Sequence, residues 1–549
     1  MSTIIRSTSD QPTLDIESLS KRSLVELLLD EQTELSAVER FSESHEQLTA
    51  EPAQSKYYQA LMPASQPSEH QQYAFEVDLD ACSGCKSCVV ACHTLNGLDE
   101  EEAWRSVGTL VDTEARTPAI QHVTTACHHC EDPGCLNGCP VKAYDKDPVT
   151  GIVKHLDDQC IGCKYCMLMC PYEVPRYSHR LGIVRKCDMC RQRLEQNEAP
   201  ACVQSCPNEA IAIRLVEVQQ EPCEPEERLV PSAPLSHITR PTTTFKTQST
   251  ERYLSPQDQL LLTPQESHWP LAAMLCLTQS SVGVIVAAGV LSVLDLVDVV
   301  WHLVLGLAAL LAIAGLAIAP LHLGQPTRAW RVFLGIRTSW LSREAILFGA
   351  YSSLLLGSTA IGLSDEYWPS LQFPTWLFVV SLVGSIITGL AAIFTSGMIY
   401  VVTQREPWRA ERTMTRFYLT AASFGATACC AIILFAERAP VTMAVVFAIQ
   451  AAKAWYEWSI LFGPARQADL PHDRNARAIV EQHFRELKGI RYLTAVAGLS
   501  LIAVAFLTPL PLAAILVSLS ATVVLAGEIC ERLLYFASVS FDRMPGTLR

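Results

Sequence analysis

The chain has 549 residues, of which 49% are hydrophobic and 18% charged, and its formal net charge is −14. This length is too great for one ordinary domain, and the negative charge argues against nucleic acid as a partner. The averages combine two unlike halves. The chain is polar, acidic and rich in cysteine up to about residue 265, and a succession of apolar runs follows.

Residues 1–70 form a polar extension rich in Ser, Glu and Gln. Residues 15–41 are expected to be helical, with an uneven apolar stripe made by Leu19, Leu24, Leu27, Leu28 and Val38. Amphipathicity does not separate two interpretations, a helix packed on its own domain and a docking arm for a partner subunit. Residues 1–23 contain no apolar signal-peptide core and no twin-arginine pair, so the cysteine-rich region is not expected to be exported.

Sixteen of the 21 cysteines lie in four groups between residues 82 and 206. The groups are Cys82, Cys85, Cys88 and Cys92; Cys127, Cys130, Cys135 and Cys139; Cys160, Cys163, Cys166 and Cys170; and Cys187, Cys190, Cys202 and Cys206. Three groups end in Cys-Pro, as bacterial ferredoxins do, where three thiolates hold one cluster and the fourth ligates another. At four ligands per cluster, the sequence predicts four [4Fe–4S] clusters. Disulfides would require a secreted chain, and zinc sites use two separated ligand pairs, so both alternatives fit less well.

Local patterns predict an α+β ferredoxin-like domain over residues 71–214. Residues 73–78 and 210–214 are expected to be strands, and 143–154 a hairpin around the turn at 148–151. The clusters themselves are expected to replace a large apolar core. Residues 215–264 contain seven prolines among Thr, Ser and Glu, which predicts a semi-rigid linker. The other five cysteines lack ligand spacing and are expected to be small buried residues: Cys223, Cys276, Cys429, Cys430 and Cys530.

The membrane half, residues 265–549, is expected to be an all-α bundle of about eight transmembrane helices. Each apolar run is about 20 residues long, which matches the hydrocarbon core, and unpaired backbone groups are not tolerated in lipid. The expected spans are 269–291, 301–323, 343–363, 375–402, 414–436, 440–462, 491–509 and 511–536.

The loops of this half differ sharply in charge. Loops 324–343, 403–416 and 463–491, with the tail 537–549, hold 16 Lys or Arg, whereas the opposite loops hold only Arg438. Positively charged loops remain in the cytoplasm. The pattern therefore predicts a multi-pass protein of the cytoplasmic (inner) membrane with its iron–sulfur domain on the cytoplasmic side.

Several polar residues interrupt the apolar spans, and ionisable groups at membrane depth are functional candidates. They are His322, Gln325, Arg328, Arg343, Glu344, Gln450, Lys453, Glu457, Glu528 and Arg532. A quinol that loses two electrons also loses two protons, so a His or Glu beside it is required. We therefore expect His322, Arg328, Glu344 and Glu528 to form the quinol site. No haem is expected, because His302 and His322 lie on one span and no other span offers a histidine.

Several of these candidates also have a structural interpretation. Arg328 and Arg343 are placed where long side chains reach lipid headgroups. Glu528 with Arg532, and Lys453 with Glu457, have the i, i+4 spacing of helix ion pairs.

Residues 71–214 resemble the iron–sulfur subunit of the dimethyl sulfoxide reductase family, most closely at 160–177, CIGCKYCMLMCPYEVPRY. Residues 267–549 resemble that family's membrane anchor, through 266–271, 321–329, 341–344 and 526–529. The resemblance implies a menaquinol-oxidising anchor, a four-cluster electron-transfer subunit and a separate molybdopterin-containing catalytic subunit. It places the family's menaquinol histidine at His322. The best-known relatives hold their catalytic pair outside the cytoplasmic membrane, opposite to the side that the charge pattern predicts here.

The resemblance also implies how the cysteines are shared. The sets are Cys82, Cys85, Cys88 and Cys206; Cys187, Cys190, Cys202 and Cys92; Cys127, Cys130, Cys135 and Cys170; and Cys160, Cys163, Cys166 and Cys139. Some relatives replace the third cysteine of the third group and hold a three-iron cluster. This chain keeps Cys166, which implies four irons there.

The chain is thus interpreted as an electron-transfer and anchor subunit that performs quinol oxidation and leaves terminal reduction to a partner. Three alternatives stay open. The current can run in reverse, from a formate- or hydrogen-oxidising subunit into quinone; the partner can be a cytoplasmic nitrate reductase; or the chain can be a membrane redox sensor or scaffold.

Overall fold

The computed structural model describes residues 23, 25, 55–112, 119–218, 223–248, 254–259, 261–295, 300–367, 373–462 and 470–547. The chain divides into one unit at Met1–Ala60 and a second at Leu61–Arg549. In the first, helix α4 (Ser55–Tyr58) is described. The helix expected over 15–41, with its proposed docking arm, lies outside the described residues apart from Ser23 and Val25.

The cysteine-rich region is built on two small sheets. In one, β1 (Gln71–Asp78) pairs antiparallel with β8 (Ile211–Glu217) and parallel with β9 (Thr244–Lys246). In the other, β2 (Ser106–Asp112) lies between β3 (Ala119–Thr125) and β10 (Ser255–Pro256). The strands expected at 73–78 and 210–214 are confirmed as β1 and β8, which bring the two ends of the region together.

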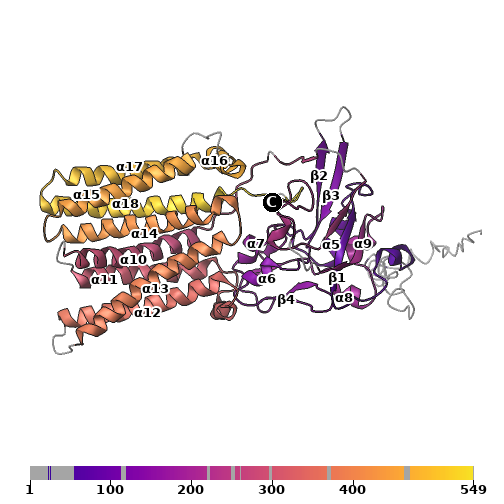
Figure 1. The fold of residues 1–549 in the computed structure, drawn as a ribbon, viewed down its shortest axis with the longest axis horizontal. Coiled ribbons are helices and arrows are strands. Elements are labelled where there is room, and N and C mark those ends of the chain that lie inside the picture. The colour runs from indigo at the N-terminus through magenta and orange to yellow at the C-terminus, as the bar shows by residue number, and fades with distance from the viewer. Residues whose placement is uncertain are drawn as a thin grey trace, which may run out of the picture. The chain divides into compact units, whose positions relative to one another are not determined.

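Two hairpins and five short helices complete this region. Strands β4 (Tyr144–Lys146) and β5 (Val153–His155) form the expected hairpin, and β6 (Arg176–Ser178) pairs with β7 (Ile183–Arg185). The short helices, each beside or containing cysteines, are α5 (Ser87–Leu95), α6 (Gly134–Gly138), α7 (Tyr165–Met169), α8 (Arg191–Glu195) and α9 (Ala201–Gln204). Figure 1 shows α5, α8 and α9 near β1, and α6 and α7 nearer to the membrane half.

The expectation of a semi-rigid linker over 215–264 is wrong for its described part. Strand β9 extends the sheet beside β1, and β10 pairs Ser255 with Val111. Just before β9, the Thr242 hydroxyl donates to the His128 carbonyl at 2.8 Å. The segment is held because β1 and β2 each offer an unpaired edge, and an exposed edge is a template for a further strand.

In its described residues, the membrane half is a bundle of eight long helices, as the sequence predicted (Figure 1). They are α10 (Trp269–Val293), α11 (Trp301–Ile318), α12 (Trp340–Tyr367), α13 (Thr375–Val401), α14 (Ala410–Ile433), α15 (Pro440–Glu457), α17 (Arg485–Ala505) and α18 (Leu510–Ala537). Seven of the described helices are long and apolar enough to cross a membrane. The exception among the eight is α15, which carries Gln450, Lys453 and Glu457 on its buried side.

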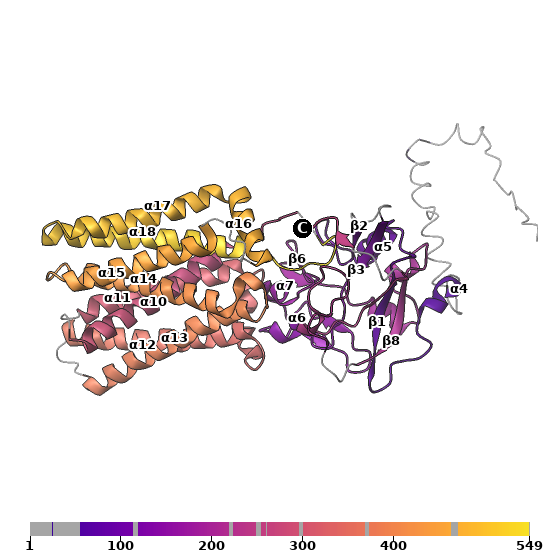
Figure 2. The ribbon, with the colours of Figure 1, turned by 45° about the horizontal axis from the view of Figure 1, so that its top comes forward.

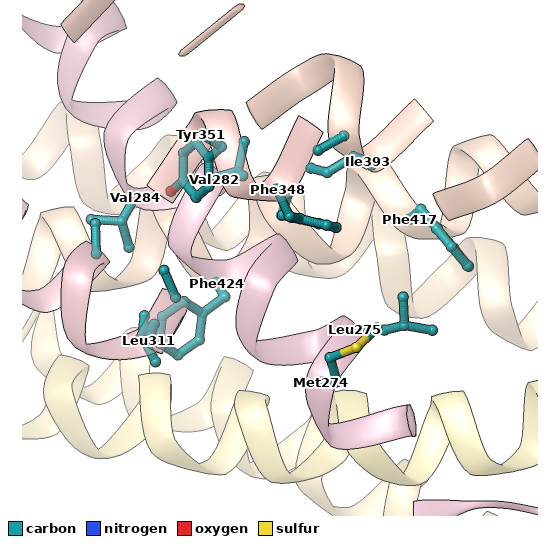
Figure 3. Close-up of a cluster of buried hydrophobic side chains, with 14 of the residues drawn as sticks. Met274, Leu275, Val282, Val284, Leu311, Phe348, Tyr351, Ile393, Phe417 and Phe424 are labelled. Carbon is teal, nitrogen blue, oxygen red and sulfur yellow. The ribbon is translucent and has the colours of Figure 1, made fainter. Parts of the chain in front are cut away.

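Helix α10 lies in the interior of the bundle and packs on α11, α13, α14 and α18. The buried side chains around it come from several helices, including Val282 of α10, Tyr351 of α12 and Phe424 of α14 (Figure 3). Small residues let α10 and α14 approach closely. A Cβ atom added to Gly283 would stand 1.9 Å from the Ala421 carbonyl oxygen. This backbone contact between small residues is typical of membrane helix packing.

Candidate functional site

Three cavities in the cysteine-rich region are each lined by four cysteines. We name the cysteines around them set A, set B and set D. Set A is Cys139, Cys160, Cys163 and Cys166; set B is Cys127, Cys130, Cys135 and Cys170; set D is Cys82, Cys85, Cys88 and Cys206. In each set, three cysteines come from one sequence group and the fourth from another.

The remaining four cysteines of the groups, Cys92, Cys187, Cys190 and Cys202, also lie together, and we name them set C. Burial, with smaller contributions from the Cys202 and Cys190 thiols, raises the pKa of Cys92 to about 12. Burial likewise raises the pKa of Cys187, and Cys92, Cys190 and Cys202 add to this effect. A thiolate, not a thiol, ligates metal. Bound iron would supply the positive charge that four crowded, buried thiolates need.

The donor chemistry fits iron–sulfur clusters. Among the described residues, no three His, Cys, Asp or Glu side chains converge closely enough to hold a single metal ion. The four thiols of sets A, B and D instead stand around a space, as ligands of a multi-iron cluster do.

Contacts between neighbouring sets give them an order. Tyr144 lines the cavity of set A and interacts electrostatically with Cys135 of set B. The Cys187 thiol of set C acts on Cys127 of set B. The Cys202 thiol of set C acts on Cys88 of set D. The sets therefore follow one another in the order A, B, C, D.

Set A lies against the membrane half. The loop between α11 and α12 hydrogen-bonds to the backbone on both sides of this set. The Gln325 amide donates to the Ile161 carbonyl at 3.0 Å, and the Gly335 amide donates to the Pro140 carbonyl at 2.7 Å. Figures 1 and 2 both show α6 and α7 next to the bundle and α5 farther from it. Because α5 carries cysteines of sets C and D, the order runs outward from the membrane half.

Arg328 belongs to this junction. Its Nη1 donates to the Asp157 carbonyl at 3.0 Å and to the Cys160 carbonyl at 3.2 Å. Arg331 makes a similar bond to the Asp158 carbonyl at 2.7 Å. Arg328 therefore holds the backbone of set A, a role that neither of its two expected interpretations included.

Three glycines make the closest part of the contact. A Cβ atom on Gly324 would stand 2.0 Å from the Gly182 carbonyl oxygen, and one on Gly162 would stand 2.3 Å from the same atom. Gly162 and Gly182 also have φ values of +68° and +65°, which disfavour other residues. Any side chain at Gly324 would push set A away from the α11–α12 loop.

His322 ends the 3₁₀ turn Ala319–His322, two residues before Gly324. Its Nδ1 is buried without a hydrogen bond of normal geometry to any described residue. Lys164, which lines the set A cavity, and His268 are close enough to act on its charge. His322 thus places a buried ring nitrogen beside set A.

Glu344 is buried in the first turns of α12 and accepts a hydrogen bond from Ser396 of α13. Tyr165 and Tyr400 both interact electrostatically with its carboxylate. The Tyr165 hydroxyl also reaches into the bundle and donates to the Ile399 carbonyl at 3.3 Å. Lys164 and Tyr165 directly follow Cys163, so the neighbours of His322 and of Glu344 are consecutive residues of set A's own segment. Sequence reasoning had not singled out either neighbour.

Glu528 lies in a different place, a buried charged network between α14, α15, α17 and α18. Its carboxylate accepts hydrogen bonds from Lys453, from Arg491 at 2.9 Å and from Thr420 at 2.7 Å. The described contacts of Glu528 do not include His322 or Glu344. This arrangement favours a structural role for Glu528 over the expected role at the quinol site.

The helix ion pairs of this network differ in part from the sequence interpretation. Lys453 and Glu457 do lie 3.7 Å apart. Arg532 does not pair with Glu528, and instead donates to Gln279 at 3.1 Å. Glu528, the partner expected for Arg532, instead binds Lys453 of α15 and Arg491 of α17.

Two buried cations of the network were counted from the sequence as loop charges. Arg416 binds Glu531 of α18, and Arg491 binds Glu457 at 2.9 Å. Both lie inside helices, α14 and α17. Arg343, the other polar candidate, donates to the Ile336 and Arg337 carbonyls at 3.1 and 2.7 Å, and so holds the loop before its own helix.

Comparisons with known proteins match the two halves separately. Residues 119–216 match the family described as 4Fe-4S dicluster domain, and residues 265–537 match the family described as DMSO reductase anchor subunit (DmsC). Two relatives from Escherichia coli K12, the probable anaerobic dimethyl sulfoxide reductase chain YnfG and one chain of the anaerobic dimethyl sulfoxide reductase, are each 30% identical over 203 residues. That alignment covers 36% of this chain and 98% of either relative.

Proteins of other systems are also similar over the cysteine-rich region. The hydrogenase-2 operon protein HybA of Escherichia coli O157:H7 is 35% identical over 160 residues, which cover 24% of this chain and 49% of HybA. The anchor match and the apolar helices mark a multi-pass membrane protein that works with a catalytic partner subunit. The chain belongs to the family of dimethyl sulfoxide reductase iron–sulfur subunits and joins to it, in one polypeptide, the membrane anchor of the same enzymes.

Proposed function

We propose that this chain oxidises menaquinol beside His322 and passes the electrons through four [4Fe–4S] clusters to a separate catalytic subunit. The proposal rests on the contact of set A with the α11–α12 loop. His322 lies near the start of this loop, and Glu344 lies in α12, shortly after the loop. When bound, each [4Fe–4S] cluster would carry one electron at a time.

The ligand assignment follows the four sets. Sets A, B, C and D would each hold one cluster through their four cysteines, which accounts for all sixteen grouped cysteines. The electrostatic contacts between successive sets support a single path from set A outward to set D. Set D, the last of the path, would face the catalytic subunit, for which we propose a molybdopterin enzyme of the dimethyl sulfoxide reductase type.

The residues of this chain would handle the protons. Quinol oxidation releases two electrons and two protons for each quinone formed. His322 has a buried ring nitrogen available to accept one proton, and the buried Glu344 carboxylate is the second acceptor. Arg328 is a positioning residue, because it holds the backbone at Cys160 and makes no contact with His322 among the described residues.

The charged loops support a cytoplasmic position for the clusters. Arg328 and Arg331 bind the cysteine-rich region, and Arg543 of the tail lies 3.8 Å from Glu173 of that region. The arginine-rich loops and the cysteine-rich region are therefore at the same end of the bundle. Arg416 and Arg491, which lie within helices, do not change the asymmetry. Positive loops stay inside, so the protons of quinol would be released to the cytoplasm of the inner membrane.

A second candidate is the reverse current, from an oxidising subunit into quinone. The similarity to HybA and to the formate dehydrogenase iron-sulfur subunit of Haemophilus influenzae, 33% identical over 169 residues, favours it as the alternative. The same path of sets would serve either direction. Cluster potentials measured against the quinone would separate the two, because electrons flow toward the higher potential.

The test is electron paramagnetic resonance of membranes treated with a menaquinol analogue. We expect reduced-cluster signals in the wild type and in His302→Ala, a matched control at the other end of α11. His322→Ala should lack these signals with quinol and regain them with dithionite. Equal reduction of His322→Ala by quinol would refute the proposed site. Loss of the dithionite signals as well would mean that the clusters had not assembled, and His322→Gln would then be measured in its place.

A further inference from the structure

Lys186 is a buried cation inside the cysteine-rich region, with only 3% of its surface exposed. Its ammonium group donates to the Val153 carbonyl, to the Cys187 carbonyl at 2.9 Å and to the Cys127 sulfur at 3.5 Å. These three acceptors use all three N–H bonds. The side chain is therefore fixed in one position, with its charge directed at a cysteine of set B.

This burial is unusual because no described carboxylate lies within 4.0 Å of the ammonium. An isolated buried charge is strongly unfavourable unless a counter-charge is near. The groups that act on the Lys186 charge are the sulfurs of Cys127, Cys135 and Cys187, which would be thiolates as ligands of bound clusters. Cys127 and Cys135 belong to set B and Cys187 to set C, so the cation stands between two sets.

Arg105 repeats the arrangement one step farther out. It is also 3% exposed, its Nη1 donates to Thr124 at 3.1 Å, and its guanidinium stacks over Phe75 at 4.7 Å. Its Nη2 is buried and has no hydrogen bond to a described oxygen or nitrogen. The groups that act on its charge are sulfurs of sets C and D, which would be thiolates as cluster ligands, in decreasing order of effect Cys202, Cys88, Cys187 and Cys92.

The junction between sets A and B differs. Tyr144 stands there, near Cys166 and Cys135, and it is neutral. Each step of the path therefore has one buried side chain: a phenol between A and B, an ammonium between B and C, and a guanidinium between C and D. A negatively charged cluster accepts an electron more readily beside a fixed positive charge.

We propose that Lys186 and Arg105 are positioning residues that act as shared counter-charges, Lys186 for the clusters of sets B and C and Arg105 for those of sets C and D, and that each raises the reduction potentials of both clusters beside it. The inference rests on the proposed four-cluster function. Each step moves one electron from a reduced cluster to an oxidised neighbour. No bond breaks and no proton moves, because the cations keep their charge throughout.

The test is a redox titration of the purified whole chain followed by electron paramagnetic resonance. In Lys186→Met, which keeps an unbranched side chain without the charge, two of the four reduction steps should move to lower potential and two should stay. At a fixed potential the oxidised-to-reduced ratio of the two clusters should rise at least tenfold, which is about 59 mV for one electron. Lys186→Arg, which keeps the positive charge, should retain the wild-type reduction potentials. Lys246→Gln should leave all four steps unchanged, because the Lys246 ammonium is exposed and binds Glu76 at 2.6 Å.

Iron content separates the possible failures. If the wild type holds fewer than four clusters by iron and sulfide analysis, the proposed function fails before any titration. If four clusters are present and no step moves in Lys186→Met, only the present inference is refuted. If Lys186→Met loses iron, Arg105→Gln is titrated instead. This variant should lower the reduction potentials of the two clusters held by sets C and D. Unchanged steps in that variant overturn the inference equally.

Discussion

The charged network around Glu528 leads to a sharp expectation for Glu528→Gln. The Glu528 carboxylate is the common acceptor for Lys453, Arg491 and Thr420. The charged side chains involved, with Glu457, are between 1% and 4% exposed. A neutral amide at position 528 leaves two buried cations with Glu457 as their shared counter-charge.

The size of the effect follows from this geometry. Removal of one partner from a buried ion pair costs about 3–5 kcal/mol, because the other charge stays buried and unpaired. Exposed pairs are worth less than about 1 kcal/mol. Lys154→Gln, which breaks the partly exposed pair with Asp145 at 2.8 Å, is therefore the matched control. We expect Glu528→Gln to lower the free energy of unfolding by about 3–5 kcal/mol and the control to change it little.

The measurement is denaturant unfolding of the purified chain in detergent, with quinol oxidation measured on the same samples. A double variant, Glu528→Gln with Lys453→Met, should recover part of the loss, because it removes the unpaired cation as well. If Glu528→Gln is as stable as the control but no longer oxidises quinol, the structural interpretation is wrong. Glu528 then returns to the quinol site, where the sequence had placed it.

Substitutions at two positions probe the contact between set A and the membrane half, and a vesicle assay probes the side on which protons are released. Gly324→Ala should abolish cluster reduction by quinol and leave reduction by dithionite intact, because the new Cβ would stand 2.0 Å from the Gly182 carbonyl; unchanged quinol reduction, followed by paramagnetic resonance, would disprove this tight fit. Arg328→Lys should slow quinol-driven reduction less than Arg328→Ala, since one ammonium still reaches the Cys160 carbonyl; equal rates in stopped-flow would argue against that bond. Turnover in sealed vesicles should generate no membrane potential, because protons accepted by His322 are released on the side that holds the clusters; a potential-sensitive dye that responded would exclude this sidedness.

The fold was predictable where each element has its own signal. Strands β1 and β8 and the hairpin β4–β5 have local patterns bounded by turns, and each membrane helix has its apolar run. Strand β9 has no such signal, because Thr244–Lys246 is short and lies among prolines and threonines. Only the free edge of β1, which is a property of the assembled sheet, makes this segment a strand.

The grouping of the cysteines around the three cavities was predictable from the sequence, and the residues beside them were less so. Cysteine spacing carries the chemistry of the clusters within the sequence itself. Arg328 stood out from the sequence as a charge at the end of a span, but its partners are backbone carbonyls, which no sequence pattern marks. Lys186 is missed for the same reason. Nothing in the sequence distinguishes it from a surface lysine. Only the structure shows that it is buried and has no described carboxylate partner.

The fusion of the two halves has a consequence for the first electron-transfer step. The described chain joins them through 261–269 and again at the tail that follows α18. In the tail, Met544 is buried beside Val77 and Leu110, and Asp542 binds Arg228 at 2.7 Å. Covalent connection makes the docking of set A on the α11–α12 loop intramolecular, so it does not depend on subunit concentration. With the tail packed into the cysteine-rich region, the contact beside His322 is held from two directions, which would favour a fixed distance for the proposed first electron transfer.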